Sequence, residues 1–347
     1  MQQHLDIERE ALHRLPGLLA DLLAEPAVAL AFHREPDDLD VDAAADRRGR
    51  KWVFEVKASS RPGIVASAAE RLRVHSPHDA LAILVVPFMT LAGASAAADR
   101  DLNWLDLSGN AHIRDDDLYI RVEGRPNQFA GRGRPSSPFA PKSSRIAHTL
   151  LLDPARWWRQ KELAEKTNLD DGHISRIVRR LDDDELLERD GAQLRPRDPD
   201  LMLDAWAEDY RFGRHDIVIG HATGSGTQLA RELHTGLAKA GIGHAFTGLV
   251  AAWVLEPFAR FRLNSAYVHG DPREAADAVG MRRNERGANV QLIGPNDQGV
   301  YLGQRDVDGL PCVSPVQTYL DLRHLPERAD EAARQLRDDH LLWDAAR

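Results

Sequence analysis

The pattern of apolar and polar positions predicts an α/β arrangement over the first third of the chain. Leucines recur at helical spacing over 4–24, which predicts an amphipathic helix. Apolar and polar residues then alternate over 39–57, as in a hairpin of two strands. The pattern that follows predicts a helix around 68–74, a buried strand at 80–86, an alanine-rich helix at 91–100 and a strand-like stretch at 102–113. Helices that alternate with strands are typical of an α/β domain, which we place at residues 1–123.

Residues 124–143 break this pattern. Their Gly, Pro and Ser content predicts a linker. Inside it, Gly131-Arg132-Gly133-Arg134-Pro135 resembles the core of an AT-hook, in which two arginines separated by a glycine lie along a narrow minor groove. Arg132 and Arg134 are therefore candidate DNA contacts, and a plain basic linker is the alternative interpretation.

The segment 144–200 predicts three short helices and a hairpin. Helical patterns occur at 144–152, 160–166 and 172–181, and Asp170 or Asp171 can cap the third helix. Two strand-like stretches, at 185–189 and 192–197, flank the turn Asp190-Gly191. This order resembles a winged helix-turn-helix, a DNA-binding domain whose third helix enters the major groove.

The third of these helices has an apolar face and a basic face. Its inward stripe consists of Ile174, Ile177, Val178 and Leu181. We expect His173, Ser175 and Arg176 to reach base edges. The residues expected at DNA phosphates are Arg179, Arg180, Lys161, Arg189 and Arg195. Arginines within one turn of each other repel, and a phosphate partner would relieve that repulsion. A protein-binding module with a solvated basic face is the alternative.

Residues 201–347 alternate strand-like and helical stretches. A strand at 216–220, the loop Ala222-Thr223-Gly224-Ser225-Gly226 and a helix at 227–240 resemble a nucleotidyltransferase core, where such a loop cradles phosphate. That chemistry also needs paired carboxylates on a neighbouring strand, and no Asp-x-Asp occurs at 245–249 or 264–269. We therefore expect the nucleotidyltransferase-like fold without transferase activity, with the two glycines of the loop as turn residues.

Candidate catalytic chemistry lies in the run Lys-Trp-Val-Phe-Glu-Val-Lys at residues 51–57. Alternate residues of a strand share a face, so Glu55 and Lys57 point one way while the apolar residues point into a core. Asp40 and Asp42 share a face of the preceding strand. Two carboxylates can hold a hard cation such as Mg²⁺, and a neighbouring lysine can orient a water. This is the chemistry of phosphodiester cleavage.

The Glu-x-Lys tripeptide, with an aspartate one hairpin upstream, resembles the PD-(D/E)XK restriction-endonuclease-like nucleases. The resemblance implies that Asp40, or Asp42 in its place, holds Mg²⁺ together with Glu55. The Val56 carbonyl would complete the metal site and Lys57 would orient the attacking water. The alternative is a Glu–Lys pair on a solvated strand face, and whether the domain cleaves DNA stays open.

Composition narrows the class of protein further. The 347 residues are 43% hydrophobic and contain no long apolar run. No secretory leader, in which a charged region is followed by an apolar region and small residues, is seen, so we expect a cytoplasmic protein without membrane contact. The single Cys312 excludes an intrachain disulfide. The net charge is −9, yet residues 131–180 hold 11 Lys and Arg against 5 Asp and Glu, a local +6 that leaves −15 to the rest. A basic middle between acidic ends predicts a polyanion partner, here double-stranded DNA.

Three segments together resemble the antitoxin and transcriptional repressor of AbiE abortive-infection (type IV toxin–antitoxin) systems. They are the helix at 172–181, Thr-Gly-Leu-Val-Ala-Ala at 247–252 and Ser-Pro-Val-Gln-Thr-Tyr-Leu-Asp-Leu at 314–322. The resemblance covers roughly 144–345 and implies binding at a promoter and opposition to a cognate toxin. By analogy with winged-helix regulators, a homodimer is expected.

The predicted fold is thus multidomain α/β and α+β. It comprises a restriction-endonuclease-like domain, a basic linker, a winged helix-turn-helix and a nucleotidyltransferase-like domain at 201–347. This chain differs from short antitoxins because it carries the nuclease-like domain in front, so two functions stay open. One is a DNA-binding transcriptional regulator or antitoxin-like protein, and the other is a metal-dependent endonuclease targeted by the winged helix. A protein that acts mainly through protein contacts is a third possibility.

Overall fold

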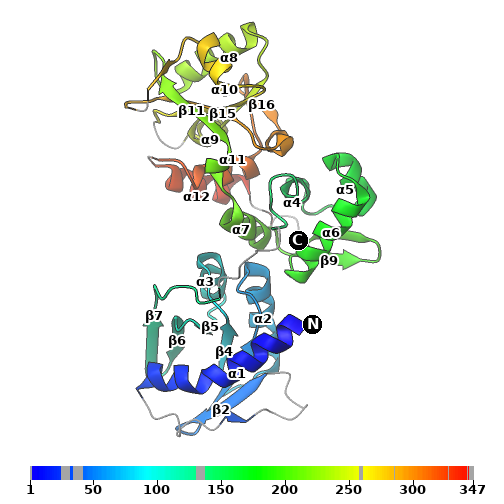
Figure 1. The fold of residues 1–347 in the computed structure, drawn as a ribbon, viewed down its shortest axis with the longest axis vertical. Coiled ribbons are helices and arrows are strands. Elements are labelled where there is room, and N and C mark those ends of the chain that lie inside the picture. Colours follow the sequence, from blue (N-terminus) through cyan, green and yellow to red (C-terminus); the bar gives the residue numbers. More distant parts are fainter. Residues whose placement is uncertain are drawn as a thin grey trace. The chain divides into compact units, whose positions relative to one another are not determined.

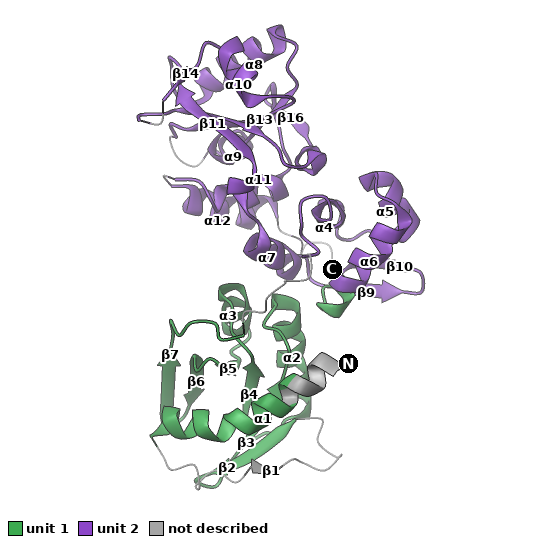
Figure 2. Cartoon of the chain, viewed as in Figure 1, with its two compact units in different colours: residues 1–135, 182–186 green, residues 136–181, 187–347 purple. Residues whose placement is uncertain are grey.

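The computed structural model of the protein contains two compact units. The residues it describes are 2–24, 32–33, 42–129, 137–257, 261–284, 286–326, 328–341 and 343. Unit 1 comprises Met1–Pro135 and Asp182–Leu186, and unit 2 comprises Ser136–Leu181 and Leu187–Arg347 (Figure 2). Both units combine helices with sheets, so the predicted multidomain α/β class is confirmed at that level.

Unit 1 is built on a sheet whose strands follow one another in chain order (Figure 1). Its described helices are α1 (Gln2–Leu23), α2 (Pro62–His75) and α3 (Leu91–Ala98). Its strands are β1 (Phe32–His33), β2 (Ala43–Arg47), β3 (Arg50–Val56), β4 (Leu81–Val86), β5 (Asn103–Asp106), β6 (Ala111–Asp115) and β7 (Leu118–Val122). The central strands β3, β4 and β5 are parallel and are joined by α2 and α3, whereas the outer pairs are antiparallel.

Both faces of this sheet are covered at β3. Trp52, Phe54 and Val56 lie in the core that includes residues of α1, as the alternation predicts. On the opposite face Val53 and Glu55 are also buried, because α2 packs on that side. A central parallel strand is commonly buried on both faces. The alternative of a Glu–Lys pair on a solvated strand face is therefore wrong, since Glu55 is 2% exposed.

The stretch expected as a single strand at 102–113 is two antiparallel strands. β5 ends at Asp106 and β6 begins at Ala111, and Gly109 in the turn between them has a φ of +95°. Side chains are strained at this φ, so glycine permits the reversal. β7, which the pattern does not predict, pairs with β6 as the last strand of the sheet.

The helices predicted at 144–152, 160–166 and 172–181 are confirmed. This part of the chain, which we call the three-helix segment, consists of α4 (Ser144–Leu152), β8 (Trp158–Arg159), α5 (Gln160–Thr167), α6 (Asp171–Asp183), β9 (Leu187–Asp190) and β10 (Gln193–Pro196). The hairpin is present, but it turns one residue later than expected, at Gly191 and Ala192, because Asp190 still pairs with Gln193; Gly191 has a φ of +56°. The two-residue strand β8 is not predicted from the sequence, and it pairs with β10.

The rest of unit 2 is a mixed sheet with helices. Its elements are α7 (Pro199–Asp209), η2 (Phe212–Arg214), β11 (Asp216–His221), α8 (Gly226–Lys239), β12 (His244–Thr247), α9 (Gly248–Leu255), β13 (Asn264–Val268), α10 (Pro272–Ala278), β14 (Arg282–Arg283), β15 (Val290–Gly294), η3 (Gln298–Tyr301), β16 (Arg305–Val307), β17 (Leu310–Cys312), α11 (Pro315–Leu322) and α12 (Ala329–His340). The strand order is β14-β11-β15-β13-β12-β17-β16. The stretch predicted as a strand at 245–249 ends earlier than expected, because Gly248 already begins α9.

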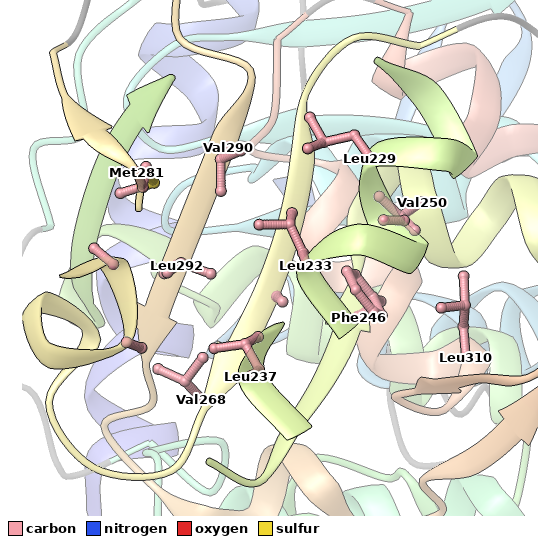
Figure 3. Packing of buried hydrophobic residues seen from close by; sticks show 14 of the residues in the cluster. Leu229, Leu233, Leu237, Phe246, Val250, Val268, Met281, Val290, Leu292 and Leu310 are labelled. Atoms are coloured by element: carbon pink, nitrogen blue, oxygen red, sulfur yellow. The ribbon is translucent and has the colours of Figure 1, made fainter. Parts of the chain in front are cut away.

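Alternation places two apolar cores on the two faces of this sheet. Ala266 and Val268 of β13 join the larger core with α8 residues such as Leu233, and Figure 3 shows this packing. Tyr267, between them in sequence, lies in the second core with Phe212. A sheet covered on both faces is a rigid support for the loops at its edges.

α4 is fastened to the C-terminal part of unit 2 by buried polar contacts. Arg145 makes a two-bond ion pair with Asp297, with Nε to Oδ1 at 2.7 Å and Nη2 to Oδ2 at 2.8 Å. His148 lies 2.7 Å from the Ser314 hydroxyl through Nε2 and 3.1 Å from the Gly299 carbonyl through Nδ1. Apart from Asp182–Leu186, which belong to unit 1, the three-helix segment and the C-terminal sheet thus belong to one compact unit.

Candidate nucleic-acid interface and carboxylate site

The Glu-x-Lys motif ends β3 of unit 1. Glu55 pairs with Lys57 at 2.8 Å between Oε1 and Nζ, and Arg71 of α2 lies 3.4 Å from the same oxygen through Nε. Sequence reasoning missed Arg71. A basic residue on the helix that follows the motif is the one available signal, because this crossover returns over the face that carries Glu55.

Asp42 lies directly across the hairpin from the motif. Its Oδ2 accepts a hydrogen bond of 2.5 Å from the Val56 N–H, and its own N–H donates to the Phe54 carbonyl at 3.0 Å. Asp42 precedes β2, which begins at Ala43, so it is a loop residue at the strand end rather than a strand residue. Asp40, the preferred aspartate of the sequence analysis, lies outside the described residues. Among the described residues, Asp42 is thus the aspartate beside Glu55.

Opposing effects act on the pKa of Glu55 at this site. Burial raises the pKa of Glu55, whereas the hydrogen bond and charge of Lys57 and the charge of Arg71 lower it, and Asp42 raises it. The two carboxylates are nearly balanced by the two cations. Glu55 is therefore buried as part of a charge cluster and not as an isolated acid.

The carboxylates fit a hard cation in part. Oε2 of Glu55 is buried and accepts no hydrogen bond from a described residue, and an oxygen with unused lone pairs suits Mg²⁺. No group of three His, Cys, Asp or Glu side chains in the described part of the chain could hold a metal. Asp42 and Glu55 would therefore supply two protein ligands, and water would supply the others, as Mg²⁺ commonly requires.

A cleft of about 550 Å³ in unit 1 lies elsewhere. It is lined by residues of α2, by Arg100 and Asp101 after α3, by residues at the start of β4 such as Leu81, and by Leu102 and Asn103 at the start of β5. These are the amino ends of the parallel strands, whereas Glu55 and Lys57 stand at the carboxyl end. Ligands of open α/β sheets usually bind at the carboxyl ends, so we do not assign this cleft to the carboxylate site.

In unit 2, α6 presents a polar face opposite an anchored apolar stripe. The Asp170 carboxylate accepts the His173 N–H at 2.8 Å and caps the helix, and α6 begins at Asp171. The buried residues are Ile174, Ile177, Val178 and Leu181, the stripe predicted from the sequence. This apolar anchor fixes which side of α6 faces solvent.

The residues predicted to contact DNA occupy different environments around α6. Ser175, Arg176, Arg179 and Lys161 of α5 are exposed, and Arg180 is half-buried. His173 is half-buried, with Nε2 at 3.0 Å from the Ser143 hydroxyl and Nδ1 at 3.2 Å from Arg176 Nη2. Burial and then the Arg176 charge lower the pKa of His173, so its ring is neutral near pH 7. His173 thus orients the Arg176 side chain by a hydrogen bond, and both Arg176 and Arg179 are exposed to solvent.

The hairpin holds the remaining predicted contacts. Arg189 is exposed beside the turn. Arg195 is half-buried, pairs with Glu188 at 2.9 Å and lies over the Trp157 ring at 4.4 Å. Arg195 therefore braces the hairpin against Trp157, a contact that sequence reasoning missed. Arg132 and Arg134 of the AT-hook-like motif lie outside the described residues.

The loop at 222–226 of unit 2 is closed by one asparagine. Asn289 donates from Nδ2 to the carbonyls of Ala222 at 2.8 Å and Gly224 at 3.1 Å, and its Oδ1 accepts the Ala222 N–H at 2.9 Å. β12, β13 and β15 of the same sheet contain no aspartate or glutamate. Gly224 and Gly226 both have positive φ, in keeping with turn residues.

Comparisons with protein-family models, with curated proteins and with solved structures give no match. None of the helices in the described part of the chain is long and apolar enough to span a membrane.

Proposed function

We propose that the protein is a DNA-binding regulator and that the three-helix segment is a winged helix-turn-helix. The observation that carries the proposal is the outward face of α6, where Ser175, Arg176 and Arg179 are exposed on a helix whose other face is buried. The order helix, strand, helix, helix, strand, strand supports it, since this is the order of a winged helix. α6 would enter the major groove and Lys161 of α5 would contact phosphate.

Electrostatics favour duplex DNA over a protein partner. Arg176 and Arg179 lie one turn apart, and like charges at this spacing destabilise a free helix. The local excess of +6 over residues 131–180 coincides with this helix in a chain of net charge −9. Phosphates would neutralise both arginines and release counterions, a gain that a neutral protein surface does not offer.

The double variant Arg176→Ala, Arg179→Ala tests the proposal. A preferred duplex is first selected from a random library with the wild-type chain, and its Kd is measured by fluorescence anisotropy. We expect the variant to bind at least about tenfold more weakly with an unchanged thermal unfolding midpoint. Arg334→Ala, an exposed arginine of α12, is the matched control and should bind like wild type. Retention of wild-type affinity by the double variant would contradict the proposal, as would failure of the wild type to select any duplex.

The C-terminal part of unit 2 supports an antitoxin-like role for this regulator. β11, the loop at 222–226 and α8 follow one another as in a nucleotidyltransferase core, while the neighbouring strands carry no carboxylates. Such a region suits binding of a cognate toxin or formation of a homodimer better than transferase chemistry. Co-purification with the product of the adjacent gene, compared with an unrelated protein of similar charge, tests this assignment.

A second candidate function is metal-dependent DNA cleavage by unit 1. It is favoured by the buried Glu55 carboxylate, whose Oε2 accepts no hydrogen bond from described residues, with Asp42 and Lys57 at the same strand end. Asp42 and Glu55 would hold Mg²⁺, which would polarise the scissile phosphate. Lys57 would release its ion pair with Glu55 and orient the attacking water.

The two functions differ in what happens to bound DNA. If unit 1 cleaves, wild-type protein with Mg²⁺ or Mn²⁺ should nick or cut the duplex that it binds. Lys57→Ala should abolish cleavage and leave the Kd within about twofold, because Lys57 is not part of the α6 face. Intact DNA after prolonged incubation of the wild type with Mn²⁺ would eliminate the nuclease and leave the regulator.

A further inference from the structure

The turn between β5 and β6 is held by a buried aspartate. The carboxylate of Asp106, which is 0% exposed, accepts the Met89 N–H at 3.0 Å, the Asn110 N–H at 2.8 Å and the Asn110 side-chain amide at 2.8 Å. Asn110 also donates from Nδ2 to the Arg125 carbonyl at 3.2 Å, and its Oδ1 accepts the Arg125 N–H at 2.8 Å. Asp106 therefore orients Asn110, and Asn110 fixes the backbone of Arg125.

Gly109 of the same turn makes room for the Arg125 guanidinium. A Cβ on Gly109 would lie 2.4 Å from Arg125 Nη1 and 3.0 Å from its Cζ, which is closer than real contacts allow. The guanidinium thus packs directly on the turn. Arg125 is nevertheless exposed, and no carboxylate in the described part of the chain forms an ion pair with it. The turn thus presents the positive charge of Arg125 at the protein surface.

This charge stands at the carboxyl end of the parallel strands. The N–H groups of Lys57 and Leu107 donate to the consecutive β4 carbonyls of Val85 and Val86, so β3, β4 and β5 end nearly level. Lys57 and the turn are therefore two strands apart, on the order of 10 Å. Arg14 of α1 reaches the same edge, with Nη1 at 3.4 Å from the Leu107 carbonyl. Of the cations at this edge, Lys57 is paired with Glu55 and Arg14 with Glu10, whereas Arg125 forms no ion pair with a described carboxylate.

We infer that Arg125 contacts the phosphodiester backbone of duplex DNA and that Asp106, Gly109 and Asn110 position it. The inference rests on the proposed DNA-binding function. A guanidinium presents a rigid fork of donors that matches phosphate oxygens, and a fixed backbone reduces the entropy lost on binding. A chain reversal alone requires no guanidinium on Gly109. Because phosphate contacts carry no sequence information, Arg125 adds affinity for every duplex and no selectivity.

Arg125→Gln in the full-length protein tests the inference. The variant removes the charge and keeps the backbone bonds to Asn110. The readout is the slope of log Kd against log salt for a fluorescein-labelled duplex of mixed sequence. We expect the slope to fall by about one and the affinity at low salt to fall several-fold. Arg125→Lys keeps the charge and should keep the wild-type slope.

The control is Arg121→Gln, which removes another exposed arginine of unit 1, one that is paired with Glu123 at 2.9 Å. It should leave the slope unchanged. A wild-type slope in Arg125→Gln overturns the inference, and so does an equal loss in Arg121→Gln, which would indicate a general effect of net charge. In either case wild-type binding through α6 would still stand. No binding of any duplex by the wild type would remove the proposed function together with this inference.

Discussion

Unit 2 buries titratable side chains among neutral hydrogen-bond partners. Burial lowers the pKa of His148 to about 4, and burial likewise lowers the pKa of His215 to about 4. Asp321 accepts hydrogen bonds from the Thr247 hydroxyl at 2.6 Å and the Tyr210 hydroxyl at 2.5 Å. Burial nonetheless raises the pKa of Asp321 to about 6. The free energy of unfolding of unit 2 must therefore depend on pH.

The two histidines and the aspartate act in opposite directions. His148 and His215 bind protons more weakly in the folded state, so their stabilisation is present above pH 6.5 and is lost as pH falls towards 4. Asp321 binds its proton more tightly when folded, so its contribution falls as pH rises from about 4 to 6. Each group contributes about 3 kcal/mol at 1.36 kcal/mol per pKa unit. Among these three groups, two histidines against one aspartate leave a net loss of about 4 kcal/mol on acidification.

We therefore expect the urea midpoint of unit 2 to fall as pH is lowered from 6.5 to 4. His148→Gln should make this fall shallower, because one depressed pKa is removed. Asp321→Asn should make it steeper, because the opposing contribution is lost. Hydrogen exchange of β13 and β15 in urea at several pH values measures the midpoint of this unit. His78→Gln, an exposed histidine of unit 1, is the control. Identical slopes in His148→Gln and wild type would contradict this assignment.

At the scale of elements, the sequence pattern predicts the structural features that depend on residues close together in the chain. The apolar stripe of α6 and its cap at Asp170 follow from spacing and side-chain chemistry within one helix, and both are present. The alternation in β3 likewise placed Trp52 and Phe54 in the core. It did not place α2 over Glu55, because coverage of the second face depends on a crossover and not on the strand itself.

The sequence pattern does not predict the elements that form through pairing with residues far away in the chain. β8 has two residues and exists as a strand because it pairs with β10 on the hairpin. The turn at Gly109 falls inside the stretch that is predicted as one strand, because the reversal depends on the side chains of Asp106 and Asn110. The residues of the candidate site likewise divide into those that a local motif predicts and those that it does not. Glu55 and Lys57 were found from a local motif, whereas Arg71 and Arg125 are brought to the sheet edge by tertiary structure.

At the scale of the whole molecule, each of the two compact units has apolar cores of its own among the residues that the structure describes. Phe54 lies in the core of unit 1 and Phe246 in the larger core of unit 2, and both are 0% exposed. The residues proposed for sequence-selective binding belong to unit 2, whereas Arg125 and the carboxylate site belong to unit 1. Destabilising unit 2 should therefore remove sequence-selective DNA binding, and destabilising unit 1 should remove the sequence-independent part of the affinity for DNA.

Phe54→Ala is the change that separates them. Truncation of a buried phenylalanine costs about 3–5 kcal/mol, enough to unfold a marginally stable unit. We expect loss of hydrogen-exchange protection in β3 and β4 with protection of β13 and β15 retained. Binding to the selected duplex should persist with a smaller salt slope, because α6 remains folded while Arg125 is no longer held. Phe246→Ala should instead abolish selective binding, since Arg145 and His148 tie α4 to the C-terminal sheet region. Simultaneous loss of protection in both units, or of selective binding in Phe54→Ala, would mean that the chain folds as a single cooperative unit.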